Sequence, residues 1–422
     1  MTLFNRIIFF IVVFSIIFSL QLLVFSTFRR FLLRNNLSKK LSNLITLLPL
    51  VLFTIPYIIF LINRFDIAFF PDWFYKFYII PFFVFQGATF FIGLYLLTGK
   101  IIKFPFLFIR FFMKKIKYLR ERYNEIVKRK DIVTFNESRR KFITASAAAV
   151  SGYAFIGAGI GAIQKDNYQI IEKDITIKNL PAELRGINII LFSDIHSGPY
   201  MNEDMMREYT NVINGMNPDL ILIPGDMTNS QKTEVIPFTK AFRDLKSKYG
   251  IYGTLGNHDY FNDANYIADA IINESPVRML RNNSATVEIK GKFINILGIE
   301  DTRDSGVNNN ALLVKYADEA LNTLNINHTA NPNILLCHKP YVFDDLSQKG
   351  FDLILSGHTH GGQIVFAKFA GVNLSIAATV NKYIDGLYRS GDSQMYVSRG
   401  IGTVGLPIRL NCPPEITKIT LV

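Results

Sequence analysis

Four stretches of 22 or 23 residues without a charged side chain constrain most strongly how this chain can fold. They are residues 7–28, 41–63, 77–99 and 142–163. A helix of about 20 apolar residues crosses the roughly 30 Å of hydrocarbon in a bilayer, so each stretch is long enough to span it. The sequence therefore predicts an all-α transmembrane anchor in residues 1–163, followed by a separate domain in residues 164–422.

Charge is divided unevenly between these two parts. Residues 1–163 contain 22 Lys and Arg against 6 Asp and Glu, whereas residues 164–422 contain 24 against 28. The excess positive charge lies beside the apolar stretches, which indicates a lipid bilayer rather than nucleic acid as the partner. The basic segments 29–40 and 100–141 should be cytoplasmic under the positive-inside rule. We therefore expect an integral protein of the cell membrane whose C-terminal domain is extracytoplasmic.

The membrane part contains segments that allow more than one interpretation. Residues 138–143 read SRRKFI before an Ala- and Gly-rich stretch, which resembles a twin-arginine export signal; a basic flank that orients the helix is the alternative. Residues 113–130 form either a helix on the inner leaflet or a solvated basic helix. The interrupted apolar stretch 101–112 is expected to be interfacial. No span has a charged residue in its middle, so this region is interpreted as an anchor rather than a transport path.

The second part alternates short apolar runs with polar turns. The runs are INIILFSD, DLILIPGD, IYGTLGNHD, NILLCHKP and DLILSGHTH, beginning at residues 187, 219, 251, 333 and 352. Such runs suit strands buried on both faces, with helices such as residues 202–215 and 233–248 between them. Each run ends in a potential metal ligand. Because the loops at the carboxyl ends of parallel strands meet at one edge, the five ends are predicted to form one site.

The candidate site residues, in chain order, are Asp194, His196, Asp226, Asn257, His258, Asp259, His338, His358 and His360. Their DxH, GD, GNHD, H and GHxH blocks resemble, complete and in order, those of the calcineurin-like metallophosphoesterase superfamily. The resemblance implies an α/β fold, a four-layer α/β/β/α sandwich of two facing mixed sheets flanked by helices. It also implies two divalent metal ions that share a hydroxide nucleophile.

By this resemblance, each of the nine residues has an expected role. The first metal is held by Asp194, His196, Asp226 and His360, and the second by Asp226, Asn257, His338 and His358, with Asp226 as the bridge. His258 stabilises the transition state or protonates the leaving oxygen, and Asp259 orients it. A site of imidazoles, carboxylates and one amide, without thiolates, favours Mn, Fe or Zn over Mg or Ca.

The resemblance implies hydrolysis of a phosphate ester or pyrophosphate, and tethering to a membrane favours a lipid-linked substrate. The closing segment RLNCPPEITKITLV is similar to that of the membrane-associated branch of this superfamily, a branch that is compared with UDP-2,3-diacylglucosamine pyrophosphatases. The soluble lipid A pyrophosphatases differ from this chain, because they have arginine at the position of His258. The alternatives are a nuclease of the same superfamily, a non-catalytic sensor, and a transporter with a regulatory domain. A nuclease is disfavoured because the domain is acidic overall and lacks a basic stripe.

Several other residues are given structural interpretations. His328 is expected to be an ordinary loop side chain, and Cys337 is expected to pack in the core. The acid-rich stretch at residues 300–304 is expected to be a solvated loop rather than part of the site. Five glycines fit tight turns near the ligands without a chemical role, namely Gly225, Gly256, Gly357, Gly361 and Gly362.

Overall fold

The computed structural model describes residues 3–57, 72–261, 263–301, 309–325, 330–369 and 372–422. The chain divides into two compact units, Met1–Ile160 and Gly161–Val422, so the boundary falls a few residues before the one expected from sequence. The end of the predicted span 41–63 lies outside the described residues, as do His328, Arg303 and Asp304.

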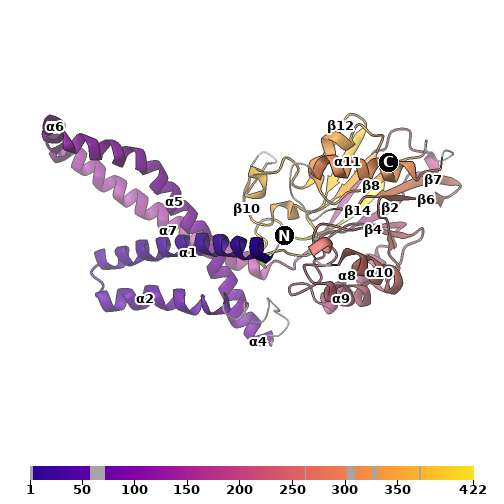
Figure 1. Ribbon diagram of the computed structural model, residues 1–422, viewed down its shortest axis with the longest axis horizontal. Helices are drawn as coiled ribbons and strands as arrows, with labels where there is room; N and C mark the ends of the chain where they lie inside the picture. Colours follow the sequence, from indigo (N-terminus) through magenta and orange to yellow (C-terminus); the bar gives the residue numbers. More distant parts are fainter. Residues whose placement is uncertain (1–2, 58–71, 262, 302–308, 326–329, 370–371) are drawn as a thin grey trace. The chain divides into compact units, whose positions relative to one another are not determined.

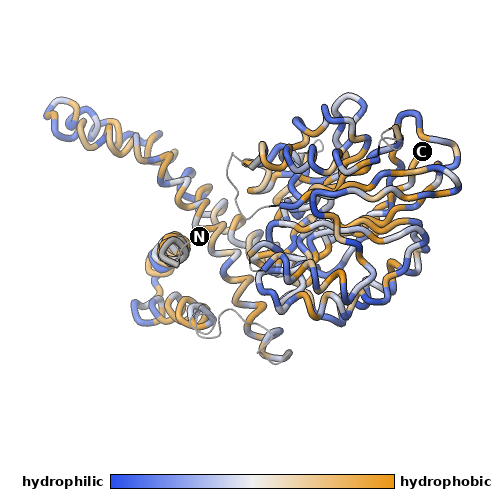
Figure 2. Tube along the Cα trace, turned by 45° about the vertical axis from the view of Figure 1, so that its right-hand side comes forward, coloured by the Kyte–Doolittle hydropathy of each residue, from blue (hydrophilic) through white to orange (hydrophobic). Residues whose placement is uncertain are grey.

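The first unit is helical (Figure 1). Its helices are α1 (Leu3–Arg34), α2 (Lys39–Leu52), α4 (Asp72–Phe74), a π-helical turn (Tyr75–Ile79), α5 (Ile80–Lys115), α6 (Lys117–Lys128) and α7 (Lys130–Ile163). Among the described residues, four helical segments are long and apolar enough to cross a membrane, namely Ile11–Arg34, Lys39–Tyr57, Tyr75–Lys115 and Lys130–Ile163. Their apolar residues stand out along the helices in Figure 2.

Two of these helices extend well beyond the expected spans. The α5 helix continues through residues 101–112, so the segment expected at the interface is helical. Helix α1 packs closely on α5, because a Cβ on Gly93 would lie only 2.7 Å from Leu20 Cβ.

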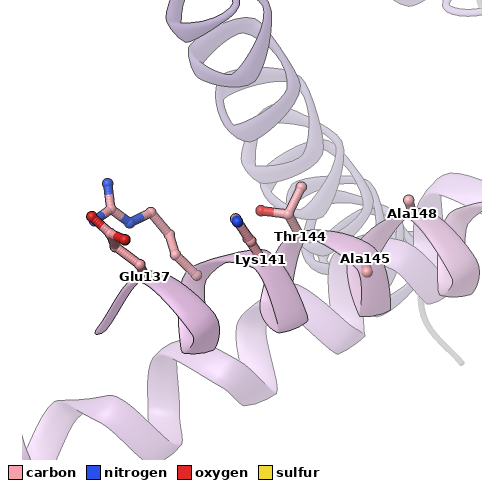
Figure 3. A pocket seen from close by; sticks show the side chains of 6 residues that line it. Glu137, Lys141, Thr144, Ala145 and Ala148 are labelled. Carbon is pink, nitrogen blue, oxygen red and sulfur yellow. The ribbon is translucent and has the colours of Figure 1, made fainter. Parts of the chain in front are cut away.

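The SRRKFI motif, residues 138–143, lies inside α7. A shallow hollow there is lined by Glu137, Arg140, Lys141, Thr144, Ala145 and Ala148 (Figure 3). Charged side chains give way to alanines along this face, as expected where a basic flank meets an apolar stretch.

Two six-stranded mixed sheets form the centre of the second unit. In spatial order, the first contains β1 (Gln169–Ile175), β14 (Glu415–Leu421), β2 (Asn188–Leu191), β3 (Leu220–Pro224), β4 (Ile251–Thr254) and β5 (Arg278–Met279). The second contains β12 (Gly386–Ser390), β13 (Ser393–Val397), β9 (Leu353–Ser356), β8 (Asn333–Leu336), β7 (Lys292–Gly298) and β6 (Asn283–Ile289). The neighbours β2, β3 and β4 are parallel, as are β8 and β9.

Alternate residues of each central strand enter different cores, which explains the continuous apolar runs. In β2, Ile189 faces the core between the sheets, whereas Ile190 packs under α8 (Glu203–Gly215), α9 (Val235–Phe242) and α10 (Ala264–Glu274). In β8, Leu336 faces the core between the sheets and Leu335 packs under α11 (Asn309–Asn322) and α12 (Phe343–Leu346). Three buried cores thus separate four layers, as Figure 1 shows, and the predicted sandwich is confirmed.

The two helices predicted in this unit agree with the observed bounds to different degrees. The helix predicted over residues 202–215 is α8, which begins one residue later because the Asn202 side chain accepts the backbone N–H of Met205. The helix predicted over residues 233–248 is too long, since α9 ends at Phe242. The side chain of Asn214 explains this early end. It accepts the N–H of Lys246 and donates to the carbonyl of Asp244, holding the chain in a turn.

Candidate metal centre

The candidate ligands lie at the carboxyl ends of five central strands. Strands β2, β3 and β4 lead to residues 194–196, 226 and 257–259 in the first sheet, and β8 and β9 lead to residues 338 and 358–360 in the second. Because the parallel strands of each sheet run in one direction, these loops gather at one end of the sandwich. The structure brings seven of the nine candidate residues into three overlapping groups, and within each group the potential ligand atoms lie within 4.8 Å of one another. The other two, Asn257 and Asp259, flank His258 in the chain.

The first group consists of Asp194, His196 and His360. The Nε2 atoms of the two histidines lie 3.0 Å apart, and His360 Nε2 lies 3.5 Å from Asp194 Oδ1. Imidazole nitrogens bind a transition metal at about 2.1 Å, so two nitrogens at right angles on one ion lie roughly 3 Å apart. Asp194 Oδ2 is buried without a hydrogen-bond partner in the described structure, so this carboxylate oxygen can coordinate a positive ion. These side chains fit a metal ion.

Asp226, His338 and His358 form the second group. Nε2 of His338 lies 3.0 Å from Asp226 Oδ2, and its Nδ1 lies 2.8 Å from the carbonyl of Pro224. Since that carbonyl can only accept, Nδ1 carries a hydrogen and Nε2 faces the site. Oδ1 of Asn257 is also buried without a partner among the described residues. An amide oxygen left in this state suits a ligand of a divalent ion.

Asp226 links the two groups. Its Oδ2 lies 3.0 Å from His338 Nε2 and 3.7 Å from His196 Nε2. Its Oδ1 accepts the backbone N–H of His258 at 2.8 Å. One carboxylate therefore reaches both groups, as a bridging ligand must.

Burial determines the protonation of these histidines. It lowers the pKa of His196 to about 3 and holds the pKa values of His358 and His360 well below the ordinary range, so these rings are neutral and can donate lone pairs. Burial acts in the same direction on His338, but the adjacent charge of Asp226 outweighs it and raises the pKa of His338 to about 10. The charge of Asp226 thus favours a cation beside His338, and a metal ion can take this position.

The ligands occupy an unusual backbone conformation. Five have a positive φ, namely Asp194 (52°), His196 (49°), Asp226 (53°), His358 (72°) and His360 (50°). Residues other than glycine seldom adopt this region, and such residues concentrate at functional sites. Neighbouring glycines allow the close approach, because a Cβ on Gly357 would clash with Asp194 Oδ2 and Ser193 Oγ, and one on Gly256 with Asp226 Oδ1. Glycine is therefore sterically required at these two positions.

His258 lies beside both groups, with its ring 4.5 Å from that of His196. Its Nδ1 contacts the carbonyl oxygen of Asn229 and therefore carries the hydrogen, which leaves Nε2 available to a substrate. The expectation that Asp259 orients this ring directly is wrong. The buried carboxylate of Asp259 instead accepts the N–H groups of Thr228 and Gly256, at 2.8 and 2.9 Å, and fixes the loops that carry the ligands.

Sequence analysis missed two buried groups behind the site. Asp301, expected in a solvated loop, is 2% exposed and lies 2.6 Å from Lys339 Nζ, next to the ligand His338. Arg409 is also buried, with Nη2 2.8 Å from the carbonyl of Arg399 and 3.2 Å from His360 Nδ1. The guanidinium faces the Nδ1 edge of His360, which leaves Nε2 directed toward Asp194 and His196. Neither group has a local sequence signal.

The four-layer fold and the grouped potential metal ligands are those of the metallophosphoesterase class. The chain belongs to the calcineurin-like phosphoesterase family, whose model matches residues 187–362. A Danio rerio protein named "Transmembrane protein with metallophosphoesterase domain" is 31% identical over 60% of this chain and 57% of its own. An uncharacterized metallophosphoesterase of Helicobacter pylori is 30% identical over 69% of this chain and 74% of its own. One from Aquifex aeolicus is 30% identical over 56% of this chain and 85% of its own. The chain thus spans little more than half of the Danio rerio relative.

Proposed function

We propose that this protein is a membrane-anchored hydrolase that binds two divalent metal ions and cleaves a phosphate ester or pyrophosphate. The observation that supports it best is the position of Asp226, whose Oδ2 lies within 3.7 Å of ligand atoms from both groups. Asp194, His196, Asp226 and His360 would hold one ion, and Asp226, Asn257, His338 and His358 the other. Bound there, two ions would supply the activation of water and the neutralisation of phosphoryl oxygens.

The residues around the proposed ions would bind the substrate, transfer a proton and position the loops. His258 is half-buried, whereas Asp194, His196, Asp226 and His338 are buried, so a substrate approaches from its side. Nδ1 of His258 donates to Asn229, so in the doubly protonated ring Nε2 donates a hydrogen bond to the phosphoryl group or a proton to the leaving oxygen. Asp259 is a positioning residue that acts through the backbone. Imidazole, carboxylate and amide donors without a thiolate suit Mn, Fe or Zn.

The membrane helices supply the proposed location. The basic segment 100–141 on the cytoplasmic side would leave residues 164–422 outside the cell membrane, and the SRRKFI motif would serve export. Confinement at a bilayer favours a lipid-linked phosphate as substrate, while the acidic net charge of the catalytic unit disfavours nucleic acid.

The test uses the full-length protein in detergent. Hydrolysis of bis-p-nitrophenyl phosphate, p-nitrophenyl phosphate, phospholipid and a lipid-linked pyrophosphate is compared before chelation, after it, and after readdition of Mn, Fe or Zn. We expect metal-dependent turnover that His258→Ala lowers by roughly 10²–10⁴-fold without loss of metal. Cleavage of soluble esters alone would contradict the lipid-linked substrate. No turnover by folded, metal-loaded protein would contradict the enzyme and favour a sensor.

A further inference from the structure

An exposed apolar surface lies on the hairpin that follows the last metal ligand. Strand β10 (Val365–Phe369) pairs with β11 (Val372–Ser375), and a 3-10 turn, η8 (Ala377–Thr379), follows (β10 is labelled in Figure 1). Four large apolar side chains of this segment are exposed, namely Phe369 (77%), Leu374 (52%), Ile376 (50%) and Val380 (77%). We call these four side chains the hairpin patch.

The hairpin patch differs from the rest of the catalytic unit. Within the described residues 161–422, the large apolar side chains that are more than 70% exposed are Ile163, Phe369 and Val380. Single exposed apolar residues are common on soluble proteins, but several within twelve residues mark an interaction surface. Residues 365–382 contain Lys368 and Lys382 and no acidic side chain. The surface is therefore apolar and weakly basic.

Hydrogen bonds tie the base of the hairpin to the end of the last membrane helix. The N–H of Val365 donates to the carbonyl of Leu410 at 2.9 Å, and the neighbouring N–H of Arg409 donates to the carbonyl of Gly161 at 3.0 Å. Gly161 lies in the last turn of α7, directly after the apolar residues 142–160. If α7 spans the bilayer, these bonds hold the hairpin base beside the point where the chain leaves the membrane.

The same hairpin adjoins the metal ligands. His360 begins the 3-10 turn η7 (His360–Gly362), and η7 contacts η8. Gly362 packs against the side chain of Ser375, because a Cβ on Gly362 would lie 2.9 Å from Ser375 Cβ. Contact between the hairpin patch and lipid would thus bring the metal centre to the lipid headgroups.

We propose that the hairpin patch docks into the interfacial region of the bilayer that holds the protein's own helices, so that lipid-borne phosphates reach the metal centre. Apolar side chains enter the boundary between headgroups and acyl chains. Lys368 favours anionic lipids, whereas Lys382 is paired with Asp344 at 3.0 Å. This inference rests on the membrane anchoring in the proposed function, and its docking step is independent of the metal chemistry.

Site-specific quenching tests the docking. Full-length Phe369→Cys, labelled with bimane, is reconstituted into vesicles of phosphatidylcholine and phosphatidylglycerol, with iodide available on both sides. We expect quenching by a nitroxide lipid and protection from iodide. Ile272→Cys on α10, 51% exposed in the native residue, is the control and should show the reverse. Equal iodide quenching at positions 369 and 272 would overturn the proposal. Shielding of position 369 from both iodide and the nitroxide lipid would also overturn it, because protein would then cover the patch.

Activity separates this inference from the proposed function. The double variant Phe369→Ser, Val380→Ser should lose on the order of tenfold in kcat/KM for a lipid-borne phosphate and keep its rate on soluble bis-p-nitrophenyl phosphate. Equal rates of variant and wild type on the lipid-borne substrate would overturn the proposed presentation of lipid. If wild type cleaves neither substrate, the proposed function fails, whereas the quenching result still decides the docking.

Discussion

The carboxylate of Asp226 accepts a hydrogen bond from the backbone N–H of His258, with 2.8 Å between Oδ1 and the nitrogen. The residue assigned to bridge the metal ions therefore also holds the loop that carries the candidate proton donor. The proposed function thus couples metal binding and catalysis at this carboxylate, and two single variants can separate them.

Asp226→Asn keeps an oxygen that can accept the His258 N–H but removes the charge. We expect this variant to bind less metal than wild type and to hydrolyse bis-p-nitrophenyl phosphate no faster than metal-free protein, because a neutral amide bridges two cations poorly. His258→Ala should retain its metal and lose roughly 10²–10⁴-fold in kcat, the usual contribution of a general acid. Metal analysis and rates on the same samples check both. Loss of metal in His258→Ala would contradict the division of roles.

A methyl group at position 357 should disrupt the first ligand group. The added Cβ in Gly357→Ala would clash with Asp194 and Ser193, and overpacking of this kind costs roughly 1–3 kcal/mol. We expect a lower melting temperature and reduced metal content. Gly215→Ala is the matched control, since no atom lies within 4 Å of its added Cβ. If both variants melt like wild type and bind metal equally, the close approach at Gly357 is not required.

The buried pair of Asp301 and Lys339 should contribute strongly to stability. Their side chains are 2% and 4% exposed, so Asp301→Asn leaves a buried ammonium without its carboxylate, at a cost of about 3–5 kcal/mol. Asp392→Asn removes a pair with Lys178 that is 71% and 61% exposed, and no measurable change is expected there. Thermal unfolding of the two variants side by side checks the contrast. Equal midpoints would show that the buried pair does not support the fold.

Both cysteines should be inert in the folded protein. Burial raises the pKa of the Cys337 thiol and that of the Cys412 thiol, and each is at most 1% exposed. A thiol reagent should therefore label neither at pH 8 and both after denaturation. Counting modified thiols by mass spectrometry decides the matter. Labelling of the native wild type would contradict the described burial, and inert wild type gives the clean background that the Phe369→Cys experiment needs.

Local patterns in the sequence predict most of the catalytic fold. The runs at residues 187–194 and 219–226 show strands buried on both faces, and each leads directly to a ligand in a turn. The pairing of β1 with β14 could not be predicted, because it joins residues 169–175 to residues 415–421 across almost the whole unit. Helix ends depended on single contacts, such as the Asn214 side chain that stops α9 early.

The site shows the same difference between local and distant contacts. All seven candidate ligands lie in short motifs, and the sequence pattern alone placed them at one edge. The Asn229 carbonyl that contacts His258 has no side-chain signature, and Asp301 in sequence is indistinguishable from a solvated acid because its partner is 38 residues away. Groups that act through tertiary contacts therefore required the structure.

The most direct test of the two-metal claim is turnover measured against metal content in the full-length wild type. Metal-free protein is titrated with Mn, Fe or Zn, and each sample is assayed with bis-p-nitrophenyl phosphate and analysed for bound metal. We predict that activity rises until two ions are bound per chain, because Asp226 serves both groups. Activity that saturates at one ion per chain, or folded protein that holds two ions without turnover, would contradict the account.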